Sequence, residues 1–260
     1  MKKQTYHKVY WVVMIPLLIT LLSFVARSNK KMQCQNFEVE LHNATGNDLI
    51  TVQDIKTQVL QKTDTLAGQN IKDIREDLIE AEIERNAYVK KAEVYSTIDG
   101  KVVAEVIQHE PVIYLVGQEG QRVYLAIDGF IMPDNPSSPL RLPVGTGMFS
   151  LVHLEPQLHD YHVDSLKDRR LKEFQYIGKT IYQDALFRAA VEQVYLNEEG
   201  EYEMITKLGH HSVLLGDTTR LKEKLKKLEV FYQNAQSRGG WDRYKRLNLK
   251  YKHQVIGEKK

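Results

Sequence analysis

Cysteine is almost absent from this sequence of 260 residues. Cys34 is its one cysteine, so no disulfide can form within the chain and no site built from several cysteines can hold a metal. An intermolecular disulfide through Cys34 stays open, although an unreactive thiol is the simpler interpretation.

Long apolar segments are scarce as well, because the only one covers residues 9–26, VYWVVMIPLLITLLSFVA. As a helix it would extend roughly 27 Å, close to the ~30 Å of a bilayer core, so the sequence predicts one transmembrane helix. A cleaved signal peptide is the main alternative, but its apolar region is usually shorter and ends in small residues, whereas Phe24 lies near this end. The predicted anchor residues are Val9, Trp11, Leu17, Leu22 and Val25.

The sequence also lacks an excess of charge of one sign, both around the apolar segment and over the whole chain. Basic residues flank both ends of the apolar segment, so the positive-inside rule does not orient it. Over the whole chain, 36 basic and 34 acidic residues give a net charge of +2 and are interspersed. This balance argues against a nucleic-acid-binding groove.

Catalytic motifs are also lacking. The sequence has no Gly-x-Ser-x-Gly, no Walker loop and no Gly-x-Gly-x-x-Gly that opens a helix after a strand. His159 with His162, and His210 with His211, come nearest to metal ligands, but a catalytic zinc site needs three protein ligands. We therefore expect no catalytic, cofactor-binding or metal-binding residues and no small-molecule substrate.

The first unit after the apolar segment, residues 36–111, has the pattern of a small α+β domain. An alternating run from Phe37 predicts a strand, and the capping box of Thr51 and Asp54 begins a helix. A second helix is expected over residues 70–85. Two further strands, at 89–97 and 101–108, are joined by the tight turn Asp99-Gly100. The expected order is strand, helix, helix, strand, strand, which a sheet covered by two helices satisfies.

Residues 112–260 predict a mixed β domain with a long helix and a C-terminal helix and strand. Its expected strands are short apolar runs at residues 112–116, 123–127, 130–132, 190–196, 202–206 and 211–215. Residues 135–139, NPSSP, are a loop by composition. The expected helices are 164–190, with Gly178 as a weak point or boundary, and 218–235. The Lys and Arg residues of the second helix are expected on solvated faces, with a lipid or nucleic-acid surface as the alternative.

The terminal stretch, residues 246–256, alternates more cleanly than any other and predicts an edge strand. One interpretation is an edge whose lysines deter aggregation. The interpretation we favour is an edge that accepts a strand from a partner. The candidate partner-binding residues are Asn248, Leu249, Lys250, Tyr251, Lys252, His253 and Gln254.

Several of these features resemble the FtsQ/DivIB family of bacterial cell-division proteins, in the form found in the Bacteroidetes. The βααββ order and the stretch NAYVKKAEV at residues 86–94 resemble its POTRA domain. The stretch LGHHSVLLG at residues 208–216 resembles its β domain, and LPVGTG at residues 142–147 resembles a Pro/Gly-rich link of that family. Lys250-Tyr251 resembles the basic–aromatic pair of its partner-binding strand.

The resemblance implies a domain order and a role. The order is a cytoplasmic tail (1–8), a transmembrane helix (9–26), a linker (27–35), a POTRA domain (36–111) and an FtsQ-type β domain (112–260). The role is a non-enzymatic scaffold of the division septum in the inner membrane, with its C-terminal domains in the periplasm. Its terminal strand would bind bitopic FtsB/FtsL-type proteins, which links early and late division proteins for septal wall synthesis.

Two other functions stay open. One is a POTRA-containing protein that handles polypeptides in envelope assembly, where such modules bind strands by edge addition. Against it, the sequence shows neither tandem modules nor a long set of amphipathic barrel strands. The other is a membrane-anchored cell-wall enzyme, for which the sequence offers no catalytic motif.

Overall fold

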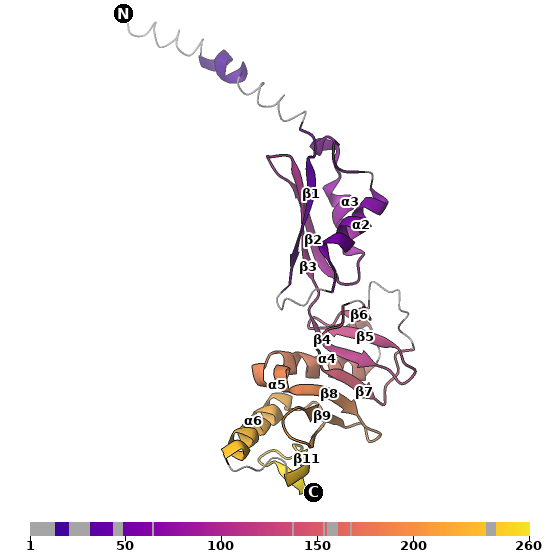
Figure 1. The fold of residues 1–260 in the computed structure, drawn as a ribbon, viewed down its shortest axis with the longest axis vertical. Coiled ribbons are helices and arrows are strands. Elements are labelled where there is room, and N and C mark those ends of the chain that lie inside the picture. Colours follow the sequence, from indigo (N-terminus) through magenta and orange to yellow (C-terminus); the bar gives the residue numbers. More distant parts are fainter. Residues whose placement is uncertain are drawn as a thin grey trace, which may run out of the picture. The chain divides into compact units, whose positions relative to one another are not determined.

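The computed structural model describes residues 14–20, 32–43, 49–63, 65–136, 138–152, 154, 161–166, 168–237 and 243–260 (Figure 1). The chain divides into two compact units. The first comprises Met1–His42, Ile50–Arg85 and Lys91–Ile107, and the second comprises Asn43–Leu49, Asn86–Lys90 and Gln108–Lys260.

The expected membrane anchor lies mostly outside the described residues. Residues 14–20 are helical, and of the five named anchor residues only Leu17 falls among them, with 54% of its surface exposed. Within the described part of the chain, no helix is both long and apolar enough to cross a bilayer.

The first unit has the predicted βααββ order. Its elements are β1 (Asn36–His42), α2 (Val52–Lys62), the short 3-10 helix η2 (Ile71–Asp73), α3 (Glu76–Glu84), β2 (Val89–Ser96) and β3 (Lys101–Gln108). The three strands form a sheet in the order β1-β3-β2, with β1 parallel to β3. The predicted capping box begins α2, and Gly100 turns between β2 and β3 with a φ of 87°.

The predicted second helix, residues 70–85, is wrong in its first half. Asn70 caps only η2, after which Ile74 is extended, with φ −74° and ψ 123°, and buries its side chain. The α-helix starts two residues later as α3. Its buried residues are Ile79 and Ile83.

The second unit is built on one nine-stranded sheet in the order β12-β11-β10-β9-β8-β7-β4-β5-β6. Its strands are β4 (Pro111–Val116), β5 (Arg122–Ala126), β6 (Ile131–Pro133), β7 (Val144–Gly147), β8 (Val191–Leu196), β9 (Tyr202–Thr206), β10 (Ser212–Gly216), β11 (Tyr244–Asn248) and β12 (Ile256–Lys259). Its helices are η3 (Val163–Ser165), α4 (Arg169–Tyr182), α5 (Ala185–Ala190) and α6 (Leu221–Ser237). The mixed α+β class is as predicted.

The larger of two buried hydrophobic clusters in the described part of the second unit joins its helices to the sheet. Phe174 of α4 and Leu228 of α6 are fully buried in it, together with Val194 of β8 and Leu247 of β11. Alternate side chains of the same strands face away from this core, and Tyr195 and Ile205 are 37% and 39% exposed there. The sheet therefore has one face against helices and a second, more exposed face.

The stretch predicted to be a link, residues 142–147, contains the central strand β7. It pairs in parallel with β4 on one side and with β8 on the other. A Cβ added at Gly145 would lie 2.3 Å from a methyl carbon of Leu115, and one added at Gly147 would lie 2.0 Å from the Leu196 carbonyl oxygen. Glycine is needed here because the neighbouring chain lies too close for a side chain. Since glycine is more common in loops, its presence favoured the prediction of a link.

The predicted long helix over residues 164–190 is two helices, α4 and α5. Gly178 is not the boundary, because it lies inside α4, where an added Cβ would approach Ile113 of β4 to 2.9 Å. The break falls at Asp184, whose carboxylate accepts hydrogen bonds from the backbone N–H groups of Leu186 and Phe187 and so begins α5.

Candidate partner-binding site

The predicted strand over residues 246–256 is wrong as a single element. It consists of β11, which ends at Asn248, a connection over residues 249–255, and β12, which returns antiparallel to β11. The side chain of Asn248 accepts a hydrogen bond of 3.0 Å from the Lys250 N–H, the local contact by which asparagine favours a turn. The alternation in the sequence is real, but this turn interrupts the strand.

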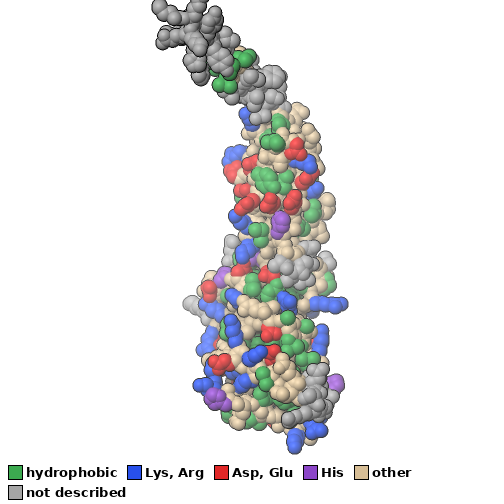
Figure 2. Space-filling model, turned by 90° about the vertical axis from the view of Figure 1, so that its left-hand side faces the viewer, with side chains coloured by type: hydrophobic (Ala, Val, Ile, Leu, Met, Phe, Trp, Pro, Cys, Tyr) green, Lys and Arg blue, Asp and Glu red, His purple; other side chains and the backbone are tan. Residues whose placement is uncertain are grey.

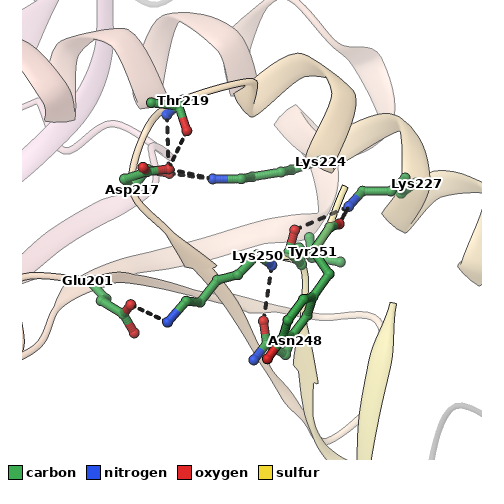
Figure 3. Close-up of polar contacts among 9 residues, drawn as sticks. Glu201, Asp217, Thr219, Lys224, Lys227, Asn248, Lys250 and Tyr251 are labelled. Carbon is green, nitrogen blue, oxygen red and sulfur yellow. Dashed lines mark hydrogen bonds and ion pairs between the residues drawn. The ribbon is translucent and has the colours of Figure 1, made fainter. Parts of the chain in front are cut away.

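Helix α6 holds the start of the connection in place. The Lys227 ammonium donates hydrogen bonds to the carbonyl oxygens of Leu249, at 3.2 Å, and of Tyr251 (Figure 3). Burial lowers the pKa of Lys227, and the nearby charges of Arg220 and Lys224 lower it further. Lys227 is therefore a structural tie between helix and connection rather than part of a solvated basic face.

Lys250 also contacts its own domain. Its ammonium lies 2.5 Å from a carboxylate oxygen of Glu201, and this hydrogen bond raises the pKa of Lys250 (Figure 3). Its stem passes over Gly216, where an added Cβ would lie 2.8 Å from the Lys250 Cγ. Gly216 has a φ of 71°, so two independent constraints favour glycine at this position.

Next to this contact, Lys224 is buried with only 3% of its side chain exposed, which corrects the expected solvated position of this lysine. Lys222 and Lys226 of α6 are exposed, as expected. Its ammonium donates to the backbone carbonyl and to the carboxylate of Asp217, both at 2.8 Å (Figure 3). Burial by itself would raise the pKa of Asp217, but the hydrogen bonds from Lys224 and Thr219 outweigh it and lower the pKa.

One edge of the sheet is β12, of which the sequence predicted only Ile256 to lie in a strand. Among the described residues, β12 pairs with β11 and with no strand on its other side. The Leu249 N–H bonds to the Leu214 carbonyl of β10, at 2.9 Å, so Asn248 directs its backbone groups to β12. Because these groups alternate along a strand, Gly257 and Lys259 direct theirs outward.

A groove of about 460 Å³ lies beside the residues that lead into β12. It is lined by Glu223, Lys226, Lys227, Val230 and Phe231 of α6 and by His253, Gln254 and Val255 of the connection. Val230 is 45% exposed although it is apolar. The groove could hold an apolar side chain of a segment that follows the β12 edge.

The structure brings the predicted partner-binding residues together only in part. Leu249 is fully buried, and Asn248 and Lys250 fix the turn. Lys250 is nevertheless exposed, as are Tyr251, Lys252, His253 and Gln254 in the connection. Sequence reasoning missed Gly257, where an added Cβ would lie 2.3 Å from the Tyr244 ring. A glycine at the end of an alternating run was the available signal for it.

Of the histidines considered as metal ligands, His159 lies outside the described residues, whereas His162 and His211 have other contacts. The His211 Nε2 lies 3.0 Å from the Tyr232 hydroxyl, and the His162 Nε2 lies 2.6 Å from the Asp128 carbonyl oxygen. Over the described residues, no three histidine, cysteine or acidic side chains are grouped so that they could hold a metal. Cys34 is buried in the first unit.

A family model described as FtsQ/DivIB, C-terminal related, matches residues 110–258, which is more than half of the chain. The chain belongs to the FtsQ/DivIB family. A model of a POTRA-like domain matches residues 32–107 of this FtsQ/DivIB protein. No protein with a curated description matches it in sequence. FtsQ/DivIB proteins are generally non-enzymatic scaffolds of cell division, and membership indicates division proteins as partners and the septum as the location.

Proposed function

We propose that this FtsQ/DivIB protein is a single-pass scaffold of the division septum that binds FtsB/FtsL-type proteins outside the cytoplasmic membrane. Residues 9–26 would be its anchor, 1–8 its cytoplasmic tail and 27–35 a linker to a POTRA domain (36–111) and an FtsQ-type β domain (112–260). The observation that carries the proposal is the edge strand β12, whose outward backbone groups have no strand partner among the described residues.

The mode of binding that fits this edge is strand addition. An extended partner segment would form backbone hydrogen bonds with the N–H and C=O groups of Gly257 and Lys259. Backbone pairing supplies affinity in such complexes, whereas side chains in adjacent pockets supply selectivity.

The surroundings of β12 support a partner with one apolar side chain and acidic neighbours. A strand that runs along β12 and past Ile256 reaches Val255 and His253 at the groove beside α6. Lys252 and Lys259 are exposed on the same segment. Their charges would favour an acidic partner and speed its association, with an effect that weakens as salt rises.

Figure 2 shows Lys and Arg side chains interspersed with Asp and Glu on the drawn face of the second unit. The surface charge there does not form a continuous basic stripe of the kind that binds nucleic acid. This charge distribution supports recognition of a partner through a defined strand edge rather than through the electrostatic field of a broad charged surface.

The experiment replaces Lys259 in the full chain by proline and, as the matched control, by alanine. Both variants lose the ammonium, but only Lys259→Pro removes an outward N–H donor. We expect Lys259→Pro to lose at least about tenfold in recovery of the FtsB/FtsL-type partner from native cells, and Lys259→Ala to retain most of it. Equal recovery by the two folded variants would remove β12 as the binding edge.

A further inference from the structure

The second edge of interest is β2 of the three-stranded sheet, which is covered by carboxylates of its own chain. The Val94 N–H donates a hydrogen bond of 2.7 Å to the Glu80 carboxylate, and the Ala92 N–H donates one of 3.1 Å to the Glu84 carboxylate. These amides point away from β3, and in an ordinary edge strand they would face water or pair with another strand.

The spacing along helix and strand explains the contacts. Glu76, one turn before Glu80, accepts a hydrogen bond of 2.6 Å from the Ser96 hydroxyl, so three glutamates four residues apart meet every second residue of β2. Four helical residues rise about 6 Å and two strand residues about 6.7 Å. A helix running antiparallel to a strand can therefore place one carboxylate on each outward position of that strand.

We propose that Glu80 and Glu84 keep the β2 edge closed, and that β2 of a second copy of this chain takes their place when they are withdrawn. The glutamates act as an internal substitute for a neighbouring strand. Because the internal contact loses no translational freedom, it prevails over a second copy at ordinary concentrations. The chain is therefore monomeric at this edge while α3 is intact.

The sequence of β2, VKKAEVYS, is complementary to itself. An antiparallel pair with Ala92 opposite Ala92 places Lys91 of each copy opposite Glu93 of the other. Since the Ala92 N–H points outward, that central pair is hydrogen-bonded, and the flanking Lys91 and Glu93 fall at the closer, non-hydrogen-bonded positions. Lys91 and Glu93 are exposed and pair with each other within one chain, so both are available for exchange across a dimer.

The test compares the full chain with the variant E80A/E84A by sedimentation velocity in mild detergent. We expect the variant to dimerise with a dissociation constant at least about tenfold below that of the unmodified chain. Hydrogen exchange of residues 89–96, measured by mass spectrometry, should rise at concentrations where the variant is monomeric and fall again in the dimer.

Two control variants isolate the cause. D77A/E82A removes the same charge from α3, but these side chains pair with Arg75 and Arg85 and not with β2, so it should stay monomeric. E80Q/E84Q keeps an acceptor oxygen at each site and should also stay monomeric. A monomeric E80A/E84A with unchanged exchange of residues 89–96 would overturn the proposal.

The register is tested by charge reversal. Adding K91E to E80A/E84A should abolish the dimer, and adding K91E together with E93K should restore it. If K91E left the dissociation constant of the dimer unchanged, the proposal would also be overturned, because the contact between the two copies would then lie elsewhere. If E80A/E84A unfolds, the same dimerisation and exchange measurements are made on the single variant E84A. This variant removes only the longer of the two hydrogen bonds to β2 and so perturbs the fold less.

Discussion

At the scale of single residues, Gly147 is constrained by both conformation and space. It has a φ of 118°, and an added Cβ would lie 2.0 Å from the Leu196 carbonyl oxygen. We expect Gly147→Ala to lower the free energy of unfolding by about 3 kcal/mol or more, because strain and a backbone clash add together. Urea denaturation of the full chain would measure this loss.

Gly200 provides the matched control for that prediction. It has a φ of 76°, but nothing lies within 4 Å of an added Cβ. Gly200→Ala should therefore show only the conformational cost, about 1–2 kcal/mol. Similar losses for the two variants would mean that the close contact of β7 with β8 is not rigid.

Asp217 gives a prediction for pH. Its pKa is lowered below the ordinary value of 3.8 in the folded chain. A lowered folded-state pKa contributes stability that is fully present above the unfolded-state pKa and is lost as pH falls through the folded-state pKa. The difference in unfolding free energy between the unmodified chain and Asp217→Asn should thus be constant from about pH 8 to 5 and shrink below about pH 4. A difference that grew on acidification would contradict the assigned contact with Lys224.

At the scale of elements, the connection between β11 and β12 is fixed by Lys250 and Glu201. Lys250→Glu would place two carboxylates next to each other and should destabilise the unit slightly, since the pair is partly exposed and screened. The exchange Lys250→Glu with Glu201→Lys should recover most of that loss, which a double-mutant cycle in urea would detect. No recovery would show that the stem of Lys250 over Gly216 matters more than its charge.

The sequence predicted elements best where one local signal was sufficient. The capping box at Thr51 and the Asp99-Gly100 turn each set an element without reference to the rest of the chain. It failed at β7, because Gly145 and Gly147 are selected by side chains and backbone that are distant in sequence. It also failed at residues 246–256, because alternation continues through the turn that Asn248 and Lys227 impose.

The candidate site was predicted in its region but not in its geometry. The terminal segment does form the end of the sheet, yet the open edge belongs to Ile256–Lys259 rather than to the predicted residues. Alternation identifies the two faces of a strand, whereas the identity of an edge depends on which strand pairs last. The burial of Lys224 had no signal in its own helix, since its partner Asp217 precedes that helix.

At the scale of the whole molecule, the proposed anchor fixes a topology. A reporter that is active only outside the cytoplasm, fused after Lys260, should be active, and a reporter that needs the cytoplasm should be inactive there. The reason is that one crossing by residues 9–26 puts everything after it on one side of the membrane. The opposite pair of reporter activities would overturn the proposed location and the proposed partners together.

The position of β7 has a consequence for how the large sheet assembles. Strands β4 to β6 form one consecutive meander and β8 to β10 form another, so each can form through short loops. Strand β7 pairs with one meander through only Tyr114 and Leu115 of β4, and its parallel pairings on both sides need long-range chain closure. Closing these long loops costs conformational entropy before the strand pairings form and compensate for it, and this cost slows folding. The two halves should therefore acquire protection from hydrogen exchange first, and the entry of a single four-residue strand should set the rate at which they become one cooperative domain.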